Sequence, residues 1–165
     1  MTTGGAIPID TVANFLVGAS SDIVEIDLSD LNGLVGTMQL SGDGASVLAA
    51  DATPTVTSIT ATASFDLGAV ATSDIANLAG ATAFTTSTLE TAIEAYGLSG
   101  GVTTSGDGIL VTYDDNVNSY LAYVTINTGK ADGALLTDVT VTNILQLTGV
   151  TNSALLVSAN LVIVS

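Results

Sequence analysis

The chain lacks cysteine, histidine, arginine and tryptophan, and Lys130 is its single basic residue. Without cysteine it can form neither a disulfide nor a thiolate metal site. Without histidine it lacks the most common general base and the most common ligand of transition metals. One lysine cannot neutralise a row of phosphates, so we expect no binding to nucleic acid. This small inventory of catalytic groups also predicts that the protein is not an enzyme.

Acidic residues dominate the charged positions, and the formal net charge is −15. Hydrophobic residues nevertheless make up 47% of the 165 residues, so the chain can bury a core and is not expected to be disordered. We predict a single β-rich domain over residues 1–165. A subdivision near the glycine-rich residues 97–108 is the alternative.

The sequence also bears on where the protein is found. No apolar run is long enough to cross a bilayer, so we expect no membrane insertion. Residues 1–10 carry neither the basic residue nor the apolar stretch of a secretory signal. The surface must be covered by Thr, Ser, Asn, Gly and Asp, which is unusual for a cytoplasmic protein. We therefore expect an extracellular or cell-surface location without a cleaved N-terminal signal peptide.

Apolar and polar residues alternate with a period of two in several segments, which is typical of strands with one buried face. The clearest segments are residues 23–28, 59–67, 135–142, 109–113 and 120–126. Asp114 to Ser119 joins the last two segments like a hairpin loop. The sequence predicts a mainly β fold, a two-sheet sandwich or a short β-roll with one or two small helices.

The two expected helices lie at about residues 73–79 and 88–96. Ser87 and Glu90 have the spacing of a capping box at the start of the second helix. In the first, Ile75 and Leu78 have helical spacing. The core is expected to contain Phe15, Ile26, Leu28, Phe65, Leu89, Ile93, Leu110, Leu121, Val141, Leu147 and Val162.

Two clusters of oxygen-bearing side chains are candidate metal ligands, because calcium prefers carboxylate and amide oxygens. One cluster is the loop with Asp114, Asp115, Asn116 and Asn118, and the other contains Asp22 and Asp27. The high acidic charge makes Ca²⁺ the candidate cofactor. The alternative is that Asp and Asn simply favour turns.

Two patterns that resemble catalytic motifs have simpler explanations. Glu90 and Glu94 lie one helical turn apart, and we expect them on a solvated helix face. Residues 97–101 match the G-x-S-x-G pattern of a nucleophile elbow, but a helix precedes the motif and no histidine can activate Ser99. We interpret this segment as a turn.

The order of several segments resembles the C-terminal regions of RTX-type substrates of type I secretion, which include bacterial adhesins and S-layer-like proteins. The segments are residues 18–31 (GASSDIVEIDLSDL), residues 104–123 with their hairpin, and the ending formed by residues 143–150 and 161–165. The resemblance implies export through an uncleaved C-terminal signal. The family's calcium nonapeptide is not repeated here, so the resemblance does not imply a long calcium β-roll.

These observations favour a self-assembling extracellular structural protein, a surface-layer or filament subunit whose partner is another copy of itself. Apolar, strand-capable segments near both ends could add to a neighbour's sheet. The candidate contact residues are Ile7, Ile9, Phe15, Leu161 and Ile163. The alternatives are that both segments pair within their own domain, and that the protein is a monomeric secreted adhesion or ligand-binding module.

Overall fold

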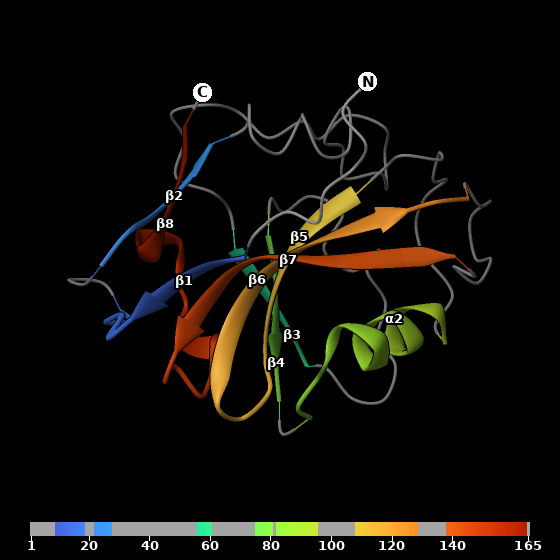
Figure 1. Ribbon diagram of the computed structural model, residues 1–165, viewed down its shortest axis with the longest axis horizontal. Helices are drawn as coiled ribbons and strands as arrows, with labels where there is room; N and C mark the ends of the chain where they lie inside the picture. The colour runs from blue at the N-terminus through green and yellow to red at the C-terminus, as the bar shows by residue number, and fades with distance from the viewer. Residues whose placement is uncertain are drawn as a thin grey trace.

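The computed structural model describes residues 9–18, 22–27, 56–60, 75–80, 82–95, 108–128 and 138–164 (Figure 1). Most of these residues lie in strands, so the predicted mainly β fold is confirmed. The elements are β1 (Asp10–Ala13), β2 (Val24–Asp27), β3 (Val56–Thr60), β4 (Ile75–Ala79), α2 (Thr86–Glu94), β5 (Gly108–Asp114), β6 (Asn118–Ile126), β7 (Val139–Thr148), the 3₁₀ turns η2 (Ser153–Leu155) and η3 (Ser158–Asn160), and β8 (Leu161–Val164).

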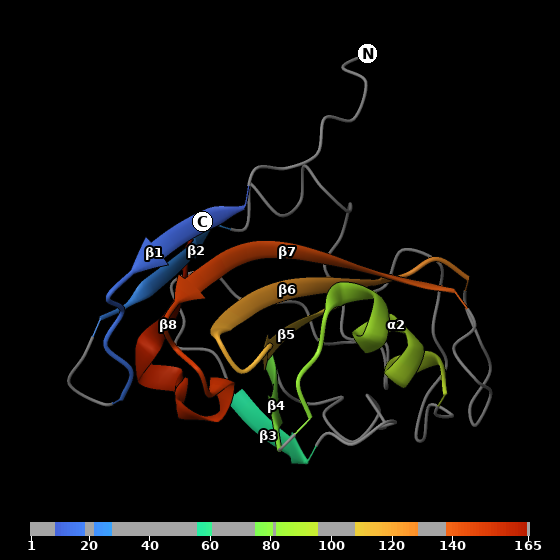
Figure 2. The same cartoon turned by 60° about the horizontal axis from the view of Figure 1, so that its bottom comes forward.

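Six strands form one mixed sheet in the order β1-β7-β6-β5-β4-β3. The pairs β5–β6 and β6–β7 are antiparallel, whereas β1–β7, β3–β4 and β4–β5 are parallel. Strand β6 is therefore the single strand of this sheet that runs opposite to the others. The sheet is strongly twisted, and β1 and β3 lie at its two ends (Figure 2).

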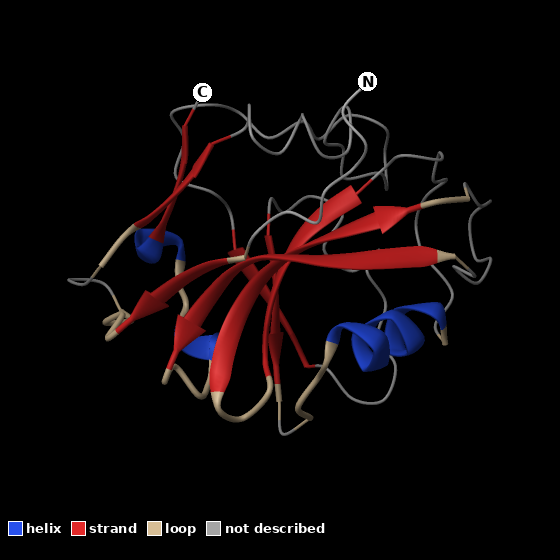
Figure 3. Cartoon of the chain, viewed as in Figure 1, coloured by secondary structure: helices blue, strands red, loops and turns tan. Residues whose placement is uncertain are grey.

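Strands β2 and β8 form a separate two-stranded parallel sheet, in which Val24 is paired with Leu161 and Asp27 with Val164. In Figure 3 this pair lies at the opposite end of the molecule from helix α2. The C-terminal strand thus pairs with a segment near the N-terminus of its own chain.

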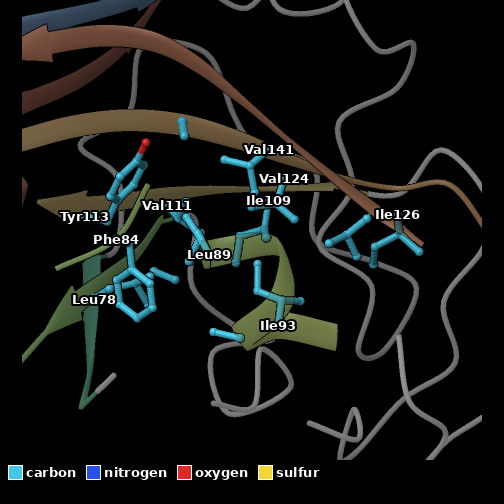
Figure 4. Packing of buried hydrophobic residues seen from close by; sticks show 14 residues of the cluster. Leu78, Phe84, Leu89, Ile93, Ile109, Val111, Tyr113, Val124, Ile126 and Val141 are labelled. Carbon is cyan, nitrogen blue, oxygen red and sulfur yellow. The ribbon is translucent and has the colours of Figure 1, made fainter. Parts of the chain in front are cut away.

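Two apolar clusters cover the two faces of the large sheet. Helix α2 contributes Leu89 and Ile93 to the first cluster, where they pack with Phe84 and with Val111 of β5 (Figure 4). The second cluster joins the sheet to β2 and β8 through Leu110, Ile26 and Leu161, together with Phe15, Ile75, Leu121, Tyr123, Leu145, Leu147, Val150 and Leu156. Because both faces are covered, β5 is buried along its whole length.

Strand β7 contributes to both clusters because it contains an irregularity in its pairing with β6. Asn143 is paired with Ala122, but Leu145 is paired with Leu121, so Ile144 is an extra residue. Such a bulge reverses the alternation of side chains along a strand. As a result Val141 belongs to the α2 cluster and Leu145 to the other one.

Helix α2 confirms the predicted helix at 88–96, but it begins two residues earlier and its cap is different. The side-chain oxygen of Thr85 accepts a hydrogen bond from the Thr88 amide, and the Thr88 hydroxyl oxygen accepts one from the Thr85 amide. The expected capping box of Ser87 and Glu90 is therefore wrong. The described part of the helix ends with Ala95 as its C-cap.

The predicted helix at 73–79 is wrong, because residues 75–79 form strand β4. Ile75 and Leu78 have helical spacing, yet they point to opposite faces of the sheet and enter different apolar clusters. Burial on both faces produces an apolar run with no alternation, and such a run can resemble a short helix.

Most of the predicted core is confirmed where it can be seen. Phe15, Ile26, Leu89, Ile93, Leu110, Leu121, Val141 and Leu147 are buried. Val162 is half-buried, and Leu28 and Phe65 lie outside the described residues. The apolar, strand-capable segment near the C-terminus forms the two 3₁₀ turns η2 and η3 followed by the short strand β8. Strand β4 lies before the glycine-rich segment that was considered as a subdivision, and β5 begins at its end. The two strands pair in one sheet.

Candidate functional site

The loop between β5 and β6 brings together the four predicted ligands Asp114, Asp115, Asn116 and Asn118. The Oδ1 atom of Asp115 accepts hydrogen bonds from the amides of Val117 (2.8 Å) and Asn118 (2.7 Å). Asn116 adopts the left-handed conformation, with φ of 68°. These are the contacts of a tight Asx-type turn, which Asp and Asn favour for their own sake.

Two stacked tyrosines stand beside this loop. The rings of Tyr113 and Tyr120 are 5.0 Å apart and nearly parallel. The Tyr120 hydroxyl donates to Asp115 Oδ2 at 2.8 Å, and the Tyr113 hydroxyl donates to Asn143 Oδ1 at 2.7 Å. Burial raises the pKa of Asp115, but the hydrogen bonds from Asn118, Tyr120 and Val117 outweigh burial, and the net pKa is lowered.

One oxygen of the Asp114 carboxylate is directed into the protein. Its Oδ2 atom accepts hydrogen bonds from the amide and the hydroxyl of Ser153, at 3.1 and 3.2 Å. The Ser153 hydroxyl also contacts Leu78 O, and Asn77 Nδ2 donates to Ser153 O and Leu156 O at 2.9 Å. This buried network attaches the C-terminal segment to β4 and β5.

The remaining oxygens of the loop are directed to different places. Asn118 Oδ1 accepts a hydrogen bond from Gly149, while Asp114 Oδ1 accepts one from Asn116. Within the part of the chain that the structure describes, no three acidic side chains form a group that could hold a metal ion. Calcium binding at this loop therefore stays a prediction, and the hydrogen bonds account for its residue types without a metal.

The second predicted cluster lies beside an open cleft of about 590 Å³ between β1 and β2. Asp22 forms part of its wall, whereas Asp27 lies at the end of β2 and is paired with Val164. The cleft is lined by Asp10, Thr11, Val12, Phe15, Asp22, Ile23, Val24, Glu25 and Leu145. Its lining thus combines apolar side chains with three carboxylates.

One buried residue that sequence reasoning missed holds the wall of this cleft in place. Asn160, fully buried, accepts hydrogen bonds from the amides of Gly18 and Val157, and its side-chain nitrogen donates to the carbonyls of Gly18 and Asp22. Asp22 in turn accepts a hydrogen bond from the Leu16 amide at 2.9 Å. Nothing in the sequence separates Asn160 from the other asparagines except its place just before an apolar strand.

The predicted subunit contacts divide into exposed and buried residues. Ile9 is exposed, whereas Phe15 and Leu161 are buried in the protein's own core. Ile163 is paired with Ile26 within the small sheet, and Ile7 lies outside the described residues. Pairing within the chain thus accounts for Phe15 and Leu161, and leaves Ile9 accessible to a partner.

Several large apolar side chains in and next to β1 are exposed. All four residues of β1 are exposed, and β1 is the last strand at its end of the sheet. Leu16 and Ile23 are 65% and 61% exposed, and Val12 in β1 is exposed as well. We call Ile9, Val12, Leu16 and Ile23 the β1 patch. Exposed apolar side chains in and beside an edge strand can be covered by a protein contact.

Glu90 and Glu94 do not lie on a freely solvated helix face, as the sequence suggested. Both are half-buried, and their Oε1 atoms accept hydrogen bonds from the amides of Val141 (2.9 Å) and Val139 (3.1 Å) in β7. The two carboxylates therefore cover part of a strand edge.

Comparisons of the chain with protein-family models, with curated proteins and with solved structures gave no match. In the described ranges, each helix is too short or too polar to extend across a bilayer. The segment 97–101 with its G-x-S-x-G pattern lies outside those ranges. The functional argument therefore depends on the geometry of the described residues and on the composition of the chain.

Proposed function

We propose that this protein is a self-assembling extracellular structural protein, a subunit of a surface layer or filament. The observation that carries the proposal is the exposed edge strand β1 with the β1 patch around it. The outer edge of a strand offers amide and carbonyl groups that a strand of another molecule can bind. The exposed apolar side chains would be covered by the same contact.

The charge of the chain supports a role for cations in this assembly. Each copy carries a formal charge of −15, and Asp10, Asp22 and Glu25 lie beside the edge that we propose as the contact. Copies that approach through this edge repel each other unless the charge is neutralised. Ca²⁺ binds carboxylate oxygens and can bridge two chains, so we propose Ca²⁺-stabilised assembly.

Electron microscopy of the purified protein, divided between EDTA and millimolar Ca²⁺, tests the proposal. We expect filaments or sheets in Ca²⁺ and few or none in EDTA. Assembly in both conditions would keep the structural role and remove the role of calcium. Monomers in both conditions, at concentrations well above micromolar, would contradict the proposed function.

A second function, a monomeric adhesion or ligand-binding module, is favoured by the cleft between β1 and β2. Its volume, about 590 Å³, lies in the range of small-molecule sites, and its mixed lining with three carboxylates would suit a small cationic or polyhydroxylated ligand. Sedimentation of a stable monomer, together with saturable ligand binding that Glu25→Gln weakens, would favour this function over assembly.

A further inference from the structure

The two end strands of the large sheet run in directions that allow one copy to pair with the next. Strands β1 and β3 are the end strands, and each is paired in parallel with its inner neighbour. Because the sheet contains two antiparallel pairs between them, β1 and β3 run in the same direction. A second copy shifted along the sheet, without reversal, would therefore place its β3 parallel to β1 of the first copy.

The two end strands also carry an apolar side chain on the same face of the sheet. Val12 of β1 is paired with Leu147, and Val56 of β3 is paired with Ile75. Leu147 and Ile75 belong to the same apolar cluster, so Val12 and Val56 lie on the same face of the sheet. Joining β1 to β3 of a second copy would bring these two valines to the same side and extend one apolar layer.

Charge favours this pairing over the pairing of two β1 strands. A β1–β1 contact would bring together Asp10, Asp22 and Glu25 of both copies. Strands β3 and β4 carry no charged residue, since their sequences are VTSIT and IANLA. A β3 edge therefore meets the acidic β1 edge with less repulsion between like charges.

A third strand edge, on β7, is already occupied by side chains of the same chain and is therefore not a candidate for contact between copies. Beyond the residues paired with β1, the edge of β7 is occupied by the carboxylates of Glu90 and Glu94. Among the described residues, no further strand pairs with the outer edge of β1 or of β3.

We propose that copies of this chain join head to tail by parallel pairing of β1 in one copy with β3 in the next, which gives one continuous sheet. The contact is heterologous, so it excludes a two-fold dimer and generates a filament when successive copies do not close into a ring. This inference rests on the proposed self-assembly and specifies the surfaces that carry it.

Thiol crosslinking tests the pairing cleanly, because the natural chain has no cysteine. Val12 and Ser58 are both exposed and lie on the same face of the two end strands. The variant V12C/S58C, treated under assembly conditions with a short thiol-reactive crosslinker, should give a ladder of covalent trimers and larger species. The control V12C/S87C places the second cysteine on exposed helix α2 and should give no ladder.

The single variants separate the other arrangements. Covalent dimers of V12C alone would overturn the proposal in favour of β1–β1 pairing, and dimers of S58C alone would do so in favour of β3–β3 pairing. Assembled protein, seen by light scattering, that yields no V12C/S58C ladder would overturn the strand pairing and leave the proposed function standing. Absence of assembly in the unmodified protein would overturn both.

Discussion

Single buried polar side chains hold the C-terminal segment onto the sheet. Ser153 connects Asp114 to the β4 backbone, and Asn160 connects the residues around Gly18 to the turn before β8. A buried polar group without a partner costs about 1–3 kcal/mol, so such groups fix one position for the segments that they join. Sequence patterns predict the apolar core well, but they do not distinguish a buried Asn or Ser from an exposed one.

Position 108 in β5 requires glycine because the side chain of Tyr123 lies very close to its backbone. A Cβ atom at this position would overlap the ring and hydroxyl of Tyr123, which is buried in the core. We expect Gly108→Ala to lower the free energy of unfolding by about 1–3 kcal/mol, as overpacking does, measured by chemical denaturation. The double variant G108A/Y123F should recover part of the loss, and an unchanged stability of G108A would contradict the model of this contact.

Ionisation of Tyr113 is expected to lower the free energy of unfolding at alkaline pH. Burial raises the pKa of Tyr113 to about 12, although its hydrogen bond to Asn143 acts in the opposite direction. A pKa raised in the folded state gives stability that is complete below the usual tyrosine pKa, near 10, and is lost as the pH rises towards 12. We expect the stability difference between the natural protein and Tyr113→Phe to shrink over this range. A difference independent of pH would show that Tyr113 titrates normally.

Among the secondary-structure elements, helix α2 fits the edge of β7 because the spacing of two glutamates on the helix matches the spacing of two amides on the strand. Glu90 and Glu94 are four helical residues apart, a rise of about 6 Å. Val139 and Val141 are two strand residues apart, a rise of about 6.8 Å. Two carboxylates can therefore accept from two successive outward-facing amides of the strand.

Removal of both carboxylates should weaken this contact. In the variant E90A/E94A the amides of Val139 and Val141 lose their acceptors, and we expect a loss of about 1–3 kcal/mol in the free energy of unfolding. Faster hydrogen exchange at these two amides, followed by NMR, would locate the effect. The variant E90Q/E94Q keeps an acceptor oxygen and should lose less, and Ser87→Ala on the exposed part of the helix should leave exchange in β7 unchanged.

The elements that were predicted correctly carry local signals. The β5–β6 hairpin has alternating strands and a loop of Asp and Asn, and α2 has apolar residues at helical spacing. Strand β4 was predicted as a helix because its burial depends on neighbours far away in the sequence. The open edge of β1 and the cleft beside it could not be predicted for the same reason, since they arise from the pairing of β1 with β7.

For the molecule as a whole, charge decides the conditions under which copies can meet. At low ionic strength a formal charge of −15 on each chain opposes association. Near 0.1 M salt the range of this repulsion falls to about 10 Å. We expect light scattering to show that assembly increases with NaCl concentration, and that CaCl₂ at equal ionic strength promotes it further. Equal effects of the two salts would indicate screening without bridging by calcium.

The sequence predicts which residues share the candidate loop, but not where their side chains are directed. Asp114, Asp115, Asn116 and Asn118 do lie in one loop, as the sequence indicated. Their side chains are divided among internal hydrogen bonds because the C-terminal segment packs beside the loop, and that contact joins residues about 40 positions apart. Composition indicated an acidic surface, but only the three-dimensional arrangement places three carboxylates next to an exposed apolar edge.

The extra residue in β7 is a place where the strand can change its length in evolution. Deleting Ile144 would join Asn143 directly to Leu145, and the pairs Asn143–Ala122 and Leu145–Leu121 would become neighbours in a regular ladder. Leu145 and Leu147 would keep their present face, so no exchange of apolar and polar residues would be needed. A single deletion in a regular part of β7 would instead turn the side chains beyond it onto the opposite face of the sheet. Single-residue changes in the length of β7 are therefore expected to occur at position 144.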